Sequence, residues 1–250
     1  MQITQDTLTW FFKDPEWKNK FLVGSALMFA ATAIPFIGWL GIFVVYGYCL
    51  ILMRATLRGE APALPKWDDF GELFVDGLKA GLAAVGFWVP PVLIFTCAFA
   101  AWFGFIFSTA LASRGASNSF PAAFPFVFVI YFFALMLANV FFYIAFAIAP
   151  VSIPQYLRTG KIGAGYRLRE MIRIVRANLG AYFLTWALFL GLQILAGVAT
   201  VLAYVTIIGC FLIPFIFAPI HFYLNLMWAT LFGAAYREAV KKIPELESSN

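Results

Sequence analysis

Four of the chain's twelve carboxylates lie in one short stretch, LPKWDDFGELFVDGLKAG, residues 64–81. They are Asp68, Asp69, Glu72 and Asp76. Carboxylates spaced three and four residues apart share one side of a helix and supply the oxygen ligands that Mg²⁺ and Ca²⁺ prefer. However, no calcium-binding loop surrounds them, and no second acidic cluster is available to complete a coordination shell. We therefore predict no metal site and interpret these residues as the water-facing side of a helix.

The apolar residues of the same stretch predict that helix. Six of them recur at the spacing of one helical face, and they are Phe70, Leu73, Phe74, Gly77, Leu78 and Gly81. Asp69 followed three residues later by Glu72 is typical of a capping box at a helix start. We expect an interfacial helix on the cytoplasmic side, with its apolar face in the lipid headgroup boundary and its acidic face in water.

A second interfacial helix, with a basic polar face, is predicted at residues 165–180, GYRLREMIRIVRANLG. Its apolar face holds Leu168, Met171, Ile172, Val175 and Leu179. Its basic face holds Arg169, Arg173 and Arg176. We expect these arginines to face Asp68, Glu72 and Asp76, directly or through a partner protein. Exposed ion pairs contribute only about 0–1 kcal/mol each, so they would orient the helices more than stabilise them.

Polar residues inside the long apolar stretches are few, namely Asn139, Gln193, His221 and Asn225. A polar cavity formed by these four would favour a transporter, because polar groups within a membrane mark substrate paths. His221, the only histidine, can ligate a haem or chlorophyll or relay a proton, but such a residue is more often a hydrogen-bonded interior residue. We predict no bound cofactor and retain His221 as the candidate ligand.

Enzyme chemistry is not indicated by the sequence. It contains no HExxH, GxSxG or P-loop motif and no pair of carboxylates inside an apolar stretch. We therefore predict no catalytic residue and no enzymatic activity. The net charge of +5 is spread over segments that flank the apolar stretches, which argues against a nucleic-acid-binding surface.

The elements that position these residues are predicted to be membrane helices. Hydrophobic residues make up 63% of the chain and charged residues 12%, against about 45–50% and about 25% in soluble domains. Four stretches carry no charge, namely Phe21–Met53, Ala80–Ser113, Gly115–Leu157 and Ala177–Tyr236. One crossing needs about 20 apolar residues. The composition predicts an all-α integral membrane protein that forms a single polytopic domain over residues 1–250.

Lysine and arginine counts predict the topology, because these residues mark cytoplasmic loops. Three precede Phe21, four lie at 54–79, six lie at 158–176 and three follow Tyr236, whereas Arg114 stands alone between the second and third stretches. This distribution predicts about six crossings in three helical hairpins, with both termini cytoplasmic.

The first hairpin has short arms of 14 and 17 residues on either side of the IPFIG turn. At 1.5 Å per residue the first arm spans about 21 Å, less than the hydrocarbon core of about 30 Å. The sequence leaves open a short tilted hairpin, a re-entrant loop or one Pro-kinked span.

Two short segments suggest related halves of the chain. LMRATLRG (52–59) and LMWATLFG (226–233) share six of eight residues, and each lies downstream of an Ile-Gly turn. We interpret residues 21–113 and 120–236 as a weak internal repeat. Such repeats occur in transporters and also in membrane proteins without a transport function.

Several segments together suggest a family. They are DPEW before the first apolar stretch, IPFIG, GYCL with Arg54 and Gly59, and above all LPKWDDFGELFVDGLK, with looser likeness in YLRTGKIGAGY and YREA. They resemble an uncharacterised family of prokaryotic multi-pass membrane proteins, a domain of unknown function. The resemblance implies a protein of the prokaryotic cytoplasmic (inner) membrane. It implies no activity, substrate or catalytic residue.

Three functions remain open on this basis. The one we favour is a non-enzymatic accessory or scaffold subunit of a membrane complex, docked through its cytoplasmic helices. The alternatives are a transporter, channel or lipid-translocating protein, and a pigment- or haem-associated subunit that uses His221. The expected partners are membrane lipids and other membrane-protein subunits or further copies of the chain, and not nucleic acid.

Overall fold

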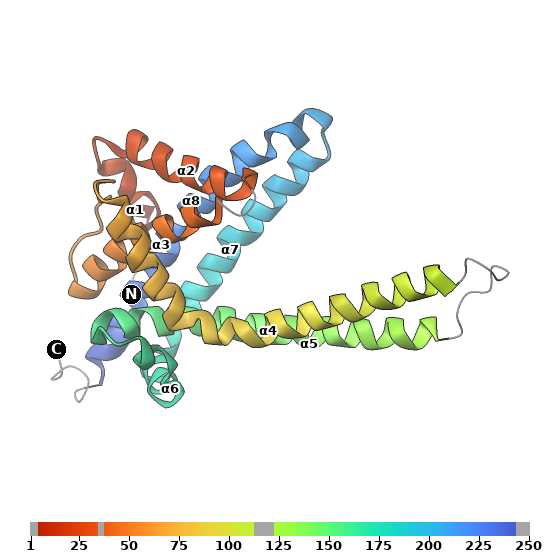
Figure 1. Ribbon diagram of the computed structural model, residues 1–250. Coiled ribbons are helices and arrows are strands. Elements are labelled where there is room, and N and C mark those ends of the chain that lie inside the picture. The colour runs from red at the N-terminus through yellow and green to blue at the C-terminus, as the bar shows by residue number, and fades with distance from the viewer. Residues whose placement is uncertain (1–4, 35–37, 113–122, 244–250) are drawn as a thin grey trace. The chain divides into compact units, whose positions relative to one another are not determined.

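The computed structural model describes residues 5–34, 38–112 and 123–243, and these residues are almost entirely helical (Figure 1). No strand occurs within these three ranges. The elements are α1 (Gln5–Thr9), η1 (Trp10–Lys13), α2 (Trp17–Ala33), α3 (Gly38–Arg58), α4 (Phe70–Ala112), α5 (Phe124–Thr159), η3 (Ile162–Tyr166), α6 (Leu168–Ala177), α7 (Leu179–Tyr204) and α8 (Ile207–Lys241). The predicted all-α fold is confirmed.

Five helices, α3, α4, α5, α7 and α8, are long and apolar enough to cross a membrane. The chain is therefore a helical membrane protein. Helix α2 has 17 residues, about 25 Å at 1.5 Å per residue, so its crossing and the total of six stay predictions. Gly38 lies against Ala30 and Gly41 lies against Leu27, so α2 and α3 form an antiparallel hairpin. This pairing excludes one Pro-kinked span, although residues 35–37 of the turn lie outside the described residues.

The chain divides into two compact units, residues 1–83 with 150–250, and residues 84–149. The second unit is an antiparallel pair formed by parts of α4 and α5. Within it Trp88 packs against Phe142, and Trp102 stacks on Tyr131 with ring centroids 4.9 Å apart. Most other large apolar side chains of this unit are exposed, as expected of helices that face lipid.

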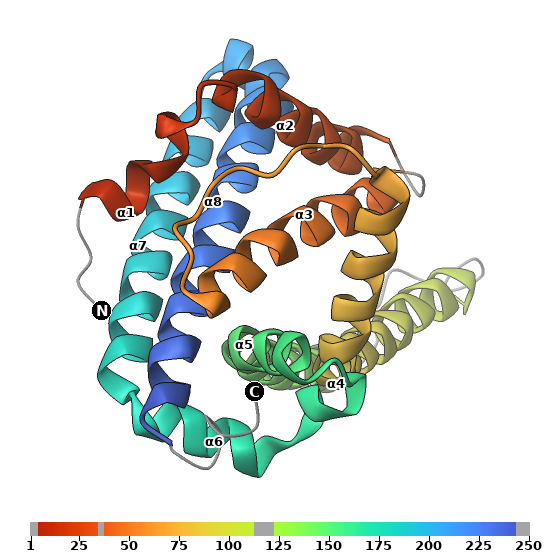
Figure 2. The same ribbon diagram turned by 90° about the vertical axis from the view of Figure 1, so that its left-hand side faces the viewer.

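Helices α3 and α8 run parallel in the first unit, with α2 packed on both and α7 packed on α8 (Figure 2). Their direction follows from two contacts, Tyr48 beside Phe222 and Thr56 beside Gly233. The two similar segments 52–59 and 226–233 lie on these helices. At three of the six shared positions both residues are buried, namely Leu52 and Leu226, Met53 and Met227, and Thr56 and Thr230. The similarity therefore reflects two helices packed in one core, and the larger internal repeat stays a prediction.

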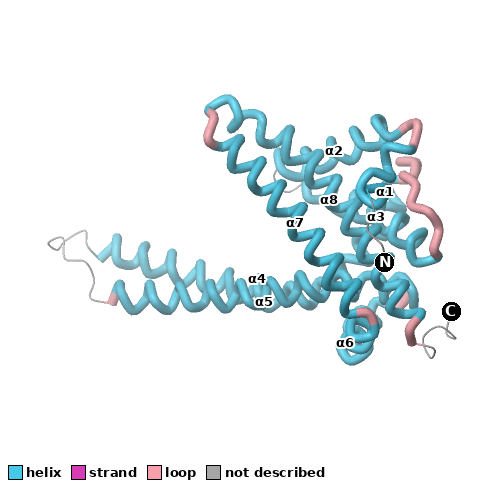
Figure 3. Tube along the Cα trace, turned by 180° about the vertical axis from the view of Figure 1, so that it is seen from behind, coloured by secondary structure: helices cyan, strands magenta, loops and turns pink. Residues whose placement is uncertain are grey.

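The connection between α3 and α4, residues 59–69, is the longest loop within the described ranges, and we call it the strap (Figure 3). Trp67 donates its indole N–H to the Lys20 carbonyl oxygen at 2.9 Å and stacks on Tyr48 with ring centroids 3.9 Å apart. The Tyr48 hydroxyl donates to the Pro65 carbonyl oxygen at 3.0 Å. These bonds tie the strap to α2 and α3 and fix where α4 begins.

Helix α4 runs from Phe70 to Ala112 without interruption, so the segment expected as a separate interfacial helix is the first part of a long helix. The reason is a close crossing with α3, where Gly77 lies against the Phe43 carbonyl and Gly47 lies against the Leu73 carbonyl. On the apolar face of this segment Leu73 and Gly77 are therefore buried, whereas Phe70 and Leu78 are exposed. Helix α6 is a separate short helix, as predicted.

The two ends of the first unit differ in charge. The α2–α3 and α7–α8 turns lie at one end, and the strap, α6 and the C-terminal end of α8 lie at the other (Figure 1). Basic residues occupy the first turn of α2 and the last two turns of α3 and α8 at this second end. We call it the charged end, and all candidate functional residues described below except the polar residues of the spans lie near it.

Candidate functional site

The acidic side chains of the strap and of the α4 start are exposed at Asp68, Asp69 and Glu72. The predicted helix cap is confirmed, because the Asp69 carboxylate accepts the Glu72 backbone N–H at 2.9 Å. Asp68 and Glu72 have no cation within ion-pair distance among the residues that the structure describes. In the same ranges, no three His, Cys, Asp or Glu side chains are grouped to hold a metal ion.

Asp76 has a different environment from the other acidic residues. Its carboxylate lies 2.7 Å from the Arg54 guanidinium, and the side chains of Asp76 and Arg54 are 17% and 34% exposed. From the sequence we expected Asp76 to face the arginines of residues 165–180, directly or through a partner protein. Arg54 takes that place because the first part of α4, which carries Asp76, packs on α3, which carries Arg54.

Helix α6 shows both charge and apolar surface to its surroundings. Arg169, Arg173 and Arg176 are exposed, and so are Leu168 and Ile172 between them. The buried side of the helix consists of Met171 and Ile174. An exposed mixture of arginine and aliphatic side chains is what an interfacial helix presents to lipid.

Three of the four polar residues of the apolar stretches hydrogen-bond within their own helix. Asn139 belongs to the second unit and donates to a carbonyl of its own helix at 2.8 Å. Asn225 donates to the His221 carbonyl oxygen at 2.8 Å. His221 hydrogen-bonds through Nδ1 to the Phe217 carbonyl at 3.0 Å and stacks on that ring. Gln193 is partly exposed on α7. Hydrogen bonds within single helices do not indicate a transport path or a haem ligand.

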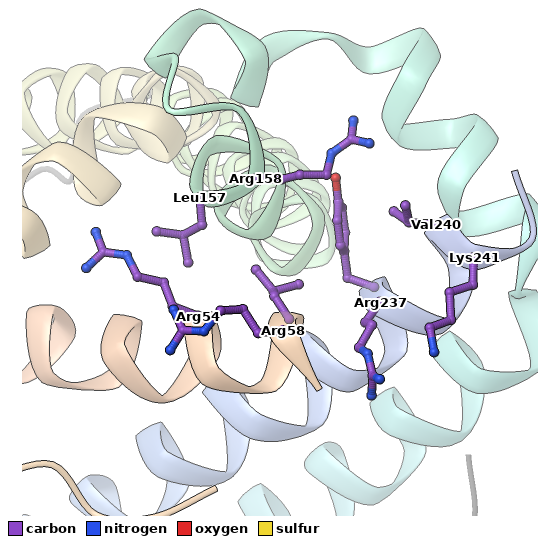
Figure 4. A pocket seen from close by; sticks show the side chains of 9 residues that line it. Arg54, Arg58, Leu157, Arg158, Arg237, Val240 and Lys241 are labelled. Carbon is purple, nitrogen blue, oxygen red and sulfur yellow. The ribbon is translucent and has the colours of Figure 1, made fainter. Parts of the chain in front are cut away.

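A pocket of about 550 Å³ opens at the charged end, where α3, α5 and α8 end (Figure 4). Its basic lining residues are Arg54, Arg58, Arg158, Arg237 and Lys241. Leu57, Leu157, Tyr236 and Val240 complete the lining. In the view of Figure 4 Leu157 lies between Arg54 and Arg158, and Val240 lies near Arg237 and Lys241. The lining therefore combines five basic side chains with four uncharged ones, and it holds no carboxylate.

Three of the five cations have carboxylate partners that lie outside the lining. The pairs are Arg54–Asp76 and Arg158–Glu170, both at 2.7 Å, and Arg58–Glu60. The hydrogen bond from Arg58 lowers the pKa of the exposed Glu60 carboxyl below its usual value. Within the described part of the chain, neither Arg237 nor Lys241 has a carboxylate within ion-pair distance.

Gly59 gives Arg237 its place. This glycine ends α3 with a φ of +85°, which a glycine adopts without steric cost. Its N–H and that of Glu60 reach back to the carbonyls of Thr56 and Ala55, both at 3.0 Å, in the pattern that closes a helix with a left-handed residue. A Cβ atom on Gly59 would collide with the Arg237 guanidinium. The missing side chain thus both ends the helix and leaves room for the arginine.

The pocket is the feature that sequence reasoning missed. Its basic residues lie in three segments separated by about a hundred and by about eighty residues, at 54–58, 158 and 237–241. Each segment reads as an ordinary cytoplasmic flank of an apolar stretch. The sequence does show a basic residue in the last turn of each of three spans, but nothing in the sequence indicates that those turns lie side by side.

Comparison with known proteins adds a family and no activity. No curated protein matches the chain. No solved structure matches it either. A family model described as "Protein of unknown function (DUF4013)" matches residues 27–205, which include α3, the strap, α4, α5, α6 and α7. The match covers well over half of the chain, and the protein therefore belongs to this family of unknown function.

Proposed function

We propose that the protein is a non-enzymatic accessory or scaffold subunit of a prokaryotic inner-membrane complex. In this proposal the charged end faces the cytoplasm, as the basic residues at the helix ends favour. The docking surface is the acidic side of the strap and of the α4 start, and the partner is a protein that presents basic side chains there.

The proposal is supported by two features of the same segment: exposed carboxylates that have no cation beside them among the described residues, and tertiary contacts that hold the segment in place. Asp68 and Glu72 are exposed and have no cation within ion-pair distance among the described residues. The strap that carries Asp68 is tied to α2 and α3 through Trp67. A surface ordered before binding loses less conformational entropy on association, and complementary charge sets the orientation and association rate of a partner.

The test is purification of a tagged chain from native membranes in mild detergent, with identification of proteins that remain bound in stoichiometric amount. We expect such a partner with the wild type and its loss with Asp68→Lys/Glu72→Lys. The matched control is Glu16→Lys/Glu60→Lys, which changes the charge equally at exposed acidic residues that already have a cation beside them, Lys20 for Glu16 and Arg58 for Glu60. The proposal is rejected if the wild type carries no stoichiometric partner or if the partner survives the Asp68/Glu72 reversal.

A further inference from the structure

The pocket at the charged end contains more positive charge than the fold requires. A helix C-terminus carries a partial negative charge that a cation in its last turn offsets. Arg58, Arg158 and Lys241 are those cations for α3, α5 and α8. Arg54 balances Asp76. Arg237 lies one turn inside α8, with its guanidinium beside Gly59 at the end of α3, where Arg58 is already the cation of the last turn. Among the described residues no carboxylate lies within ion-pair distance of Arg237.

The level at which the pocket lies in the membrane indicates what kind of ligand can reach it. Three of the candidate membrane spans end at Arg58, Thr159 and Lys241, which line the pocket or adjoin it. The ends of spans lie at the level of the lipid headgroups, where phosphate groups are concentrated. Basic pockets between spans on the cytoplasmic side are suited to anionic headgroups.

The lining chemistry indicates an amphiphile rather than a small free anion. The lining contains five basic groups, and Leu57, Leu157 and Val240 supply apolar surface beside them. Arg237 and Lys241 are four residues apart on α8, so they lie on the same face of that helix. A cavity of about 550 Å³ falls within the range of about 300–1,000 Å³ that is usual for small-molecule sites.

We propose that this pocket binds the phosphate headgroup of one anionic phospholipid. Arg237 and Lys241 contact the phosphate, and the leucine and valine side chains contact the glycerol and the first acyl carbons. Gly59 is a positioning residue, because it leaves the space that the Arg237 guanidinium occupies. This proposal is independent of the docking function of the strap, which uses other residues.

The test measures lipid retained by the purified full chain. Protein is delipidated in detergent, mixed with phosphatidylglycerol, phosphatidylcholine or inorganic phosphate, and examined by native mass spectrometry. We expect one phosphatidylglycerol per chain, little phosphatidylcholine, and no displacement by millimolar inorganic phosphate. Arg237→Gln/Lys241→Gln is expected to weaken binding about 30-fold, since each basic group near a lipid surface contributes about 1 kcal/mol.

Two further variants make the result specific. Arg169→Gln/Lys18→Gln removes the same kinds of charge from exposed sites outside the pocket and is expected to change binding less than about 3-fold. Arg237→Lys/Lys241→Arg retains the charges and is expected to retain the lipid, which guards against a folding defect. Equal loss in the Arg169/Lys18 control, unchanged binding in the Arg237/Lys241 variant, or displacement of the lipid by inorganic phosphate would overturn the proposal.

Discussion

Trp67 holds the strap by two different interactions. Its indole N–H bonds the Lys20 carbonyl, and its ring stacks on Tyr48. Lys20 in turn donates to the Leu64 carbonyl at 3.0 Å and to the Asp14 carboxylate at 2.7 Å. The residue types of the LPKWDDFGELFVDGLK segment are therefore explained in part by the tertiary contacts of Trp67, and not only by its exposed acidic side chains.

Substitution of Trp67 separates these two interactions. Trp67→Phe keeps a ring on Tyr48 but removes the hydrogen bond, and we expect a loss of about 1 kcal/mol in the free energy of unfolding. Trp67→Ala also removes the ring and is expected to cost about 3–5 kcal/mol. Thermal unfolding in detergent, followed by far-UV circular dichroism, measures both. An alanine variant as stable as the wild type would show that the strap is not held by this residue.

The Asp14–Lys20 pair makes stability depend on pH. The hydrogen bond from Lys20 lowers the pKa of Asp14 below its ordinary value of 3.8. A carboxyl whose pKa is lower in the folded state stabilises the fold fully above the ordinary value, and this contribution is lost as the pH falls through the lower folded-state pKa. We expect the melting temperature of the wild type to fall more steeply below about pH 4 than that of Asp14→Asn. Parallel acid profiles for the two proteins would contradict the assignment.

Gln155 is a buried polar residue that the fold leaves unpaired. Its side chain is 0% exposed, and neither amide atom has a hydrogen-bond partner within the described residues. An apolar residue of similar size removes the cost of burying an unpaired amide, so Gln155→Leu is expected to raise the unfolding free energy by about 1–2 kcal/mol. Gln155→Ala serves as the comparison, because it leaves a cavity and should destabilise. Calorimetry of the two variants decides whether the amide is a cost or serves an unseen interaction.

At the scale of whole elements, the crossing of α3 and α4 depends on two glycines. Gly47 and Gly77 each lie against a backbone carbonyl of the other helix. Backbone contact of this kind is how small residues allow close helix approach in membrane proteins. The crossing also explains why an amphipathic segment that resembles an interfacial helix became part of a span.

Gly77→Ala tests that crossing. A Cβ atom at this position meets the backbone at Phe43, which cannot rotate away as a side chain can. We expect a loss of about 1–3 kcal/mol in unfolding free energy, as for other overpacked sites. Gly191→Ala in α7 is the control, since a Cβ atom there would have no neighbouring atom within 4 Å and helix propensity favours alanine. If both variants unfold at the same temperature, the helices are not in close contact at Gly77.

For the whole molecule, the separation of the charged end from the two turns predicts an orientation in the membrane. The α2–α3 and α7–α8 turns lie at the end of the first unit opposite to the strap and α6 (Figure 1). If α2 crosses, as the six-crossing topology requires, both turns face the outside. The charged end then faces the cytoplasm, together with both termini.

Cysteine labelling checks this orientation. In a chain whose own cysteines are replaced, Lys18→Cys and Lys241→Cys should react with a membrane-impermeant maleimide only from the cytoplasmic side. Ile34→Cys and Val205→Cys, which are 48% and 79% exposed, should react only from the outside. Reaction of position 34 from the cytoplasmic side would instead make the first hairpin re-entrant.

The sequence by itself determined the class of protein and much of its local structure. Each uncharged stretch has 33 to 60 residues, and one membrane crossing needs about 20 apolar residues. The composition alone therefore predicted a helical membrane protein. The helix start at Asp69 was also predictable, because a cap depends only on residues three positions apart. Asp76 shows the limit of such reasoning, since we expected it to face the arginines of residues 165–180, whereas the residue that pairs with it is Arg54.

Only the tertiary structure decided which distant residues meet. Periodicity shows that a helix has an apolar face, but a lipid headgroup layer and a neighbouring helix produce the same pattern, so the packing of residues 70–81 on α3 could not be inferred. The pocket depends in the same way on the convergence of three helix ends. Arg237 lies against Gly59 across nearly 180 residues of chain, because the parallel packing of α3 and α8 brings their C-terminal turns to the same level, and no local rule of sequence carries that information.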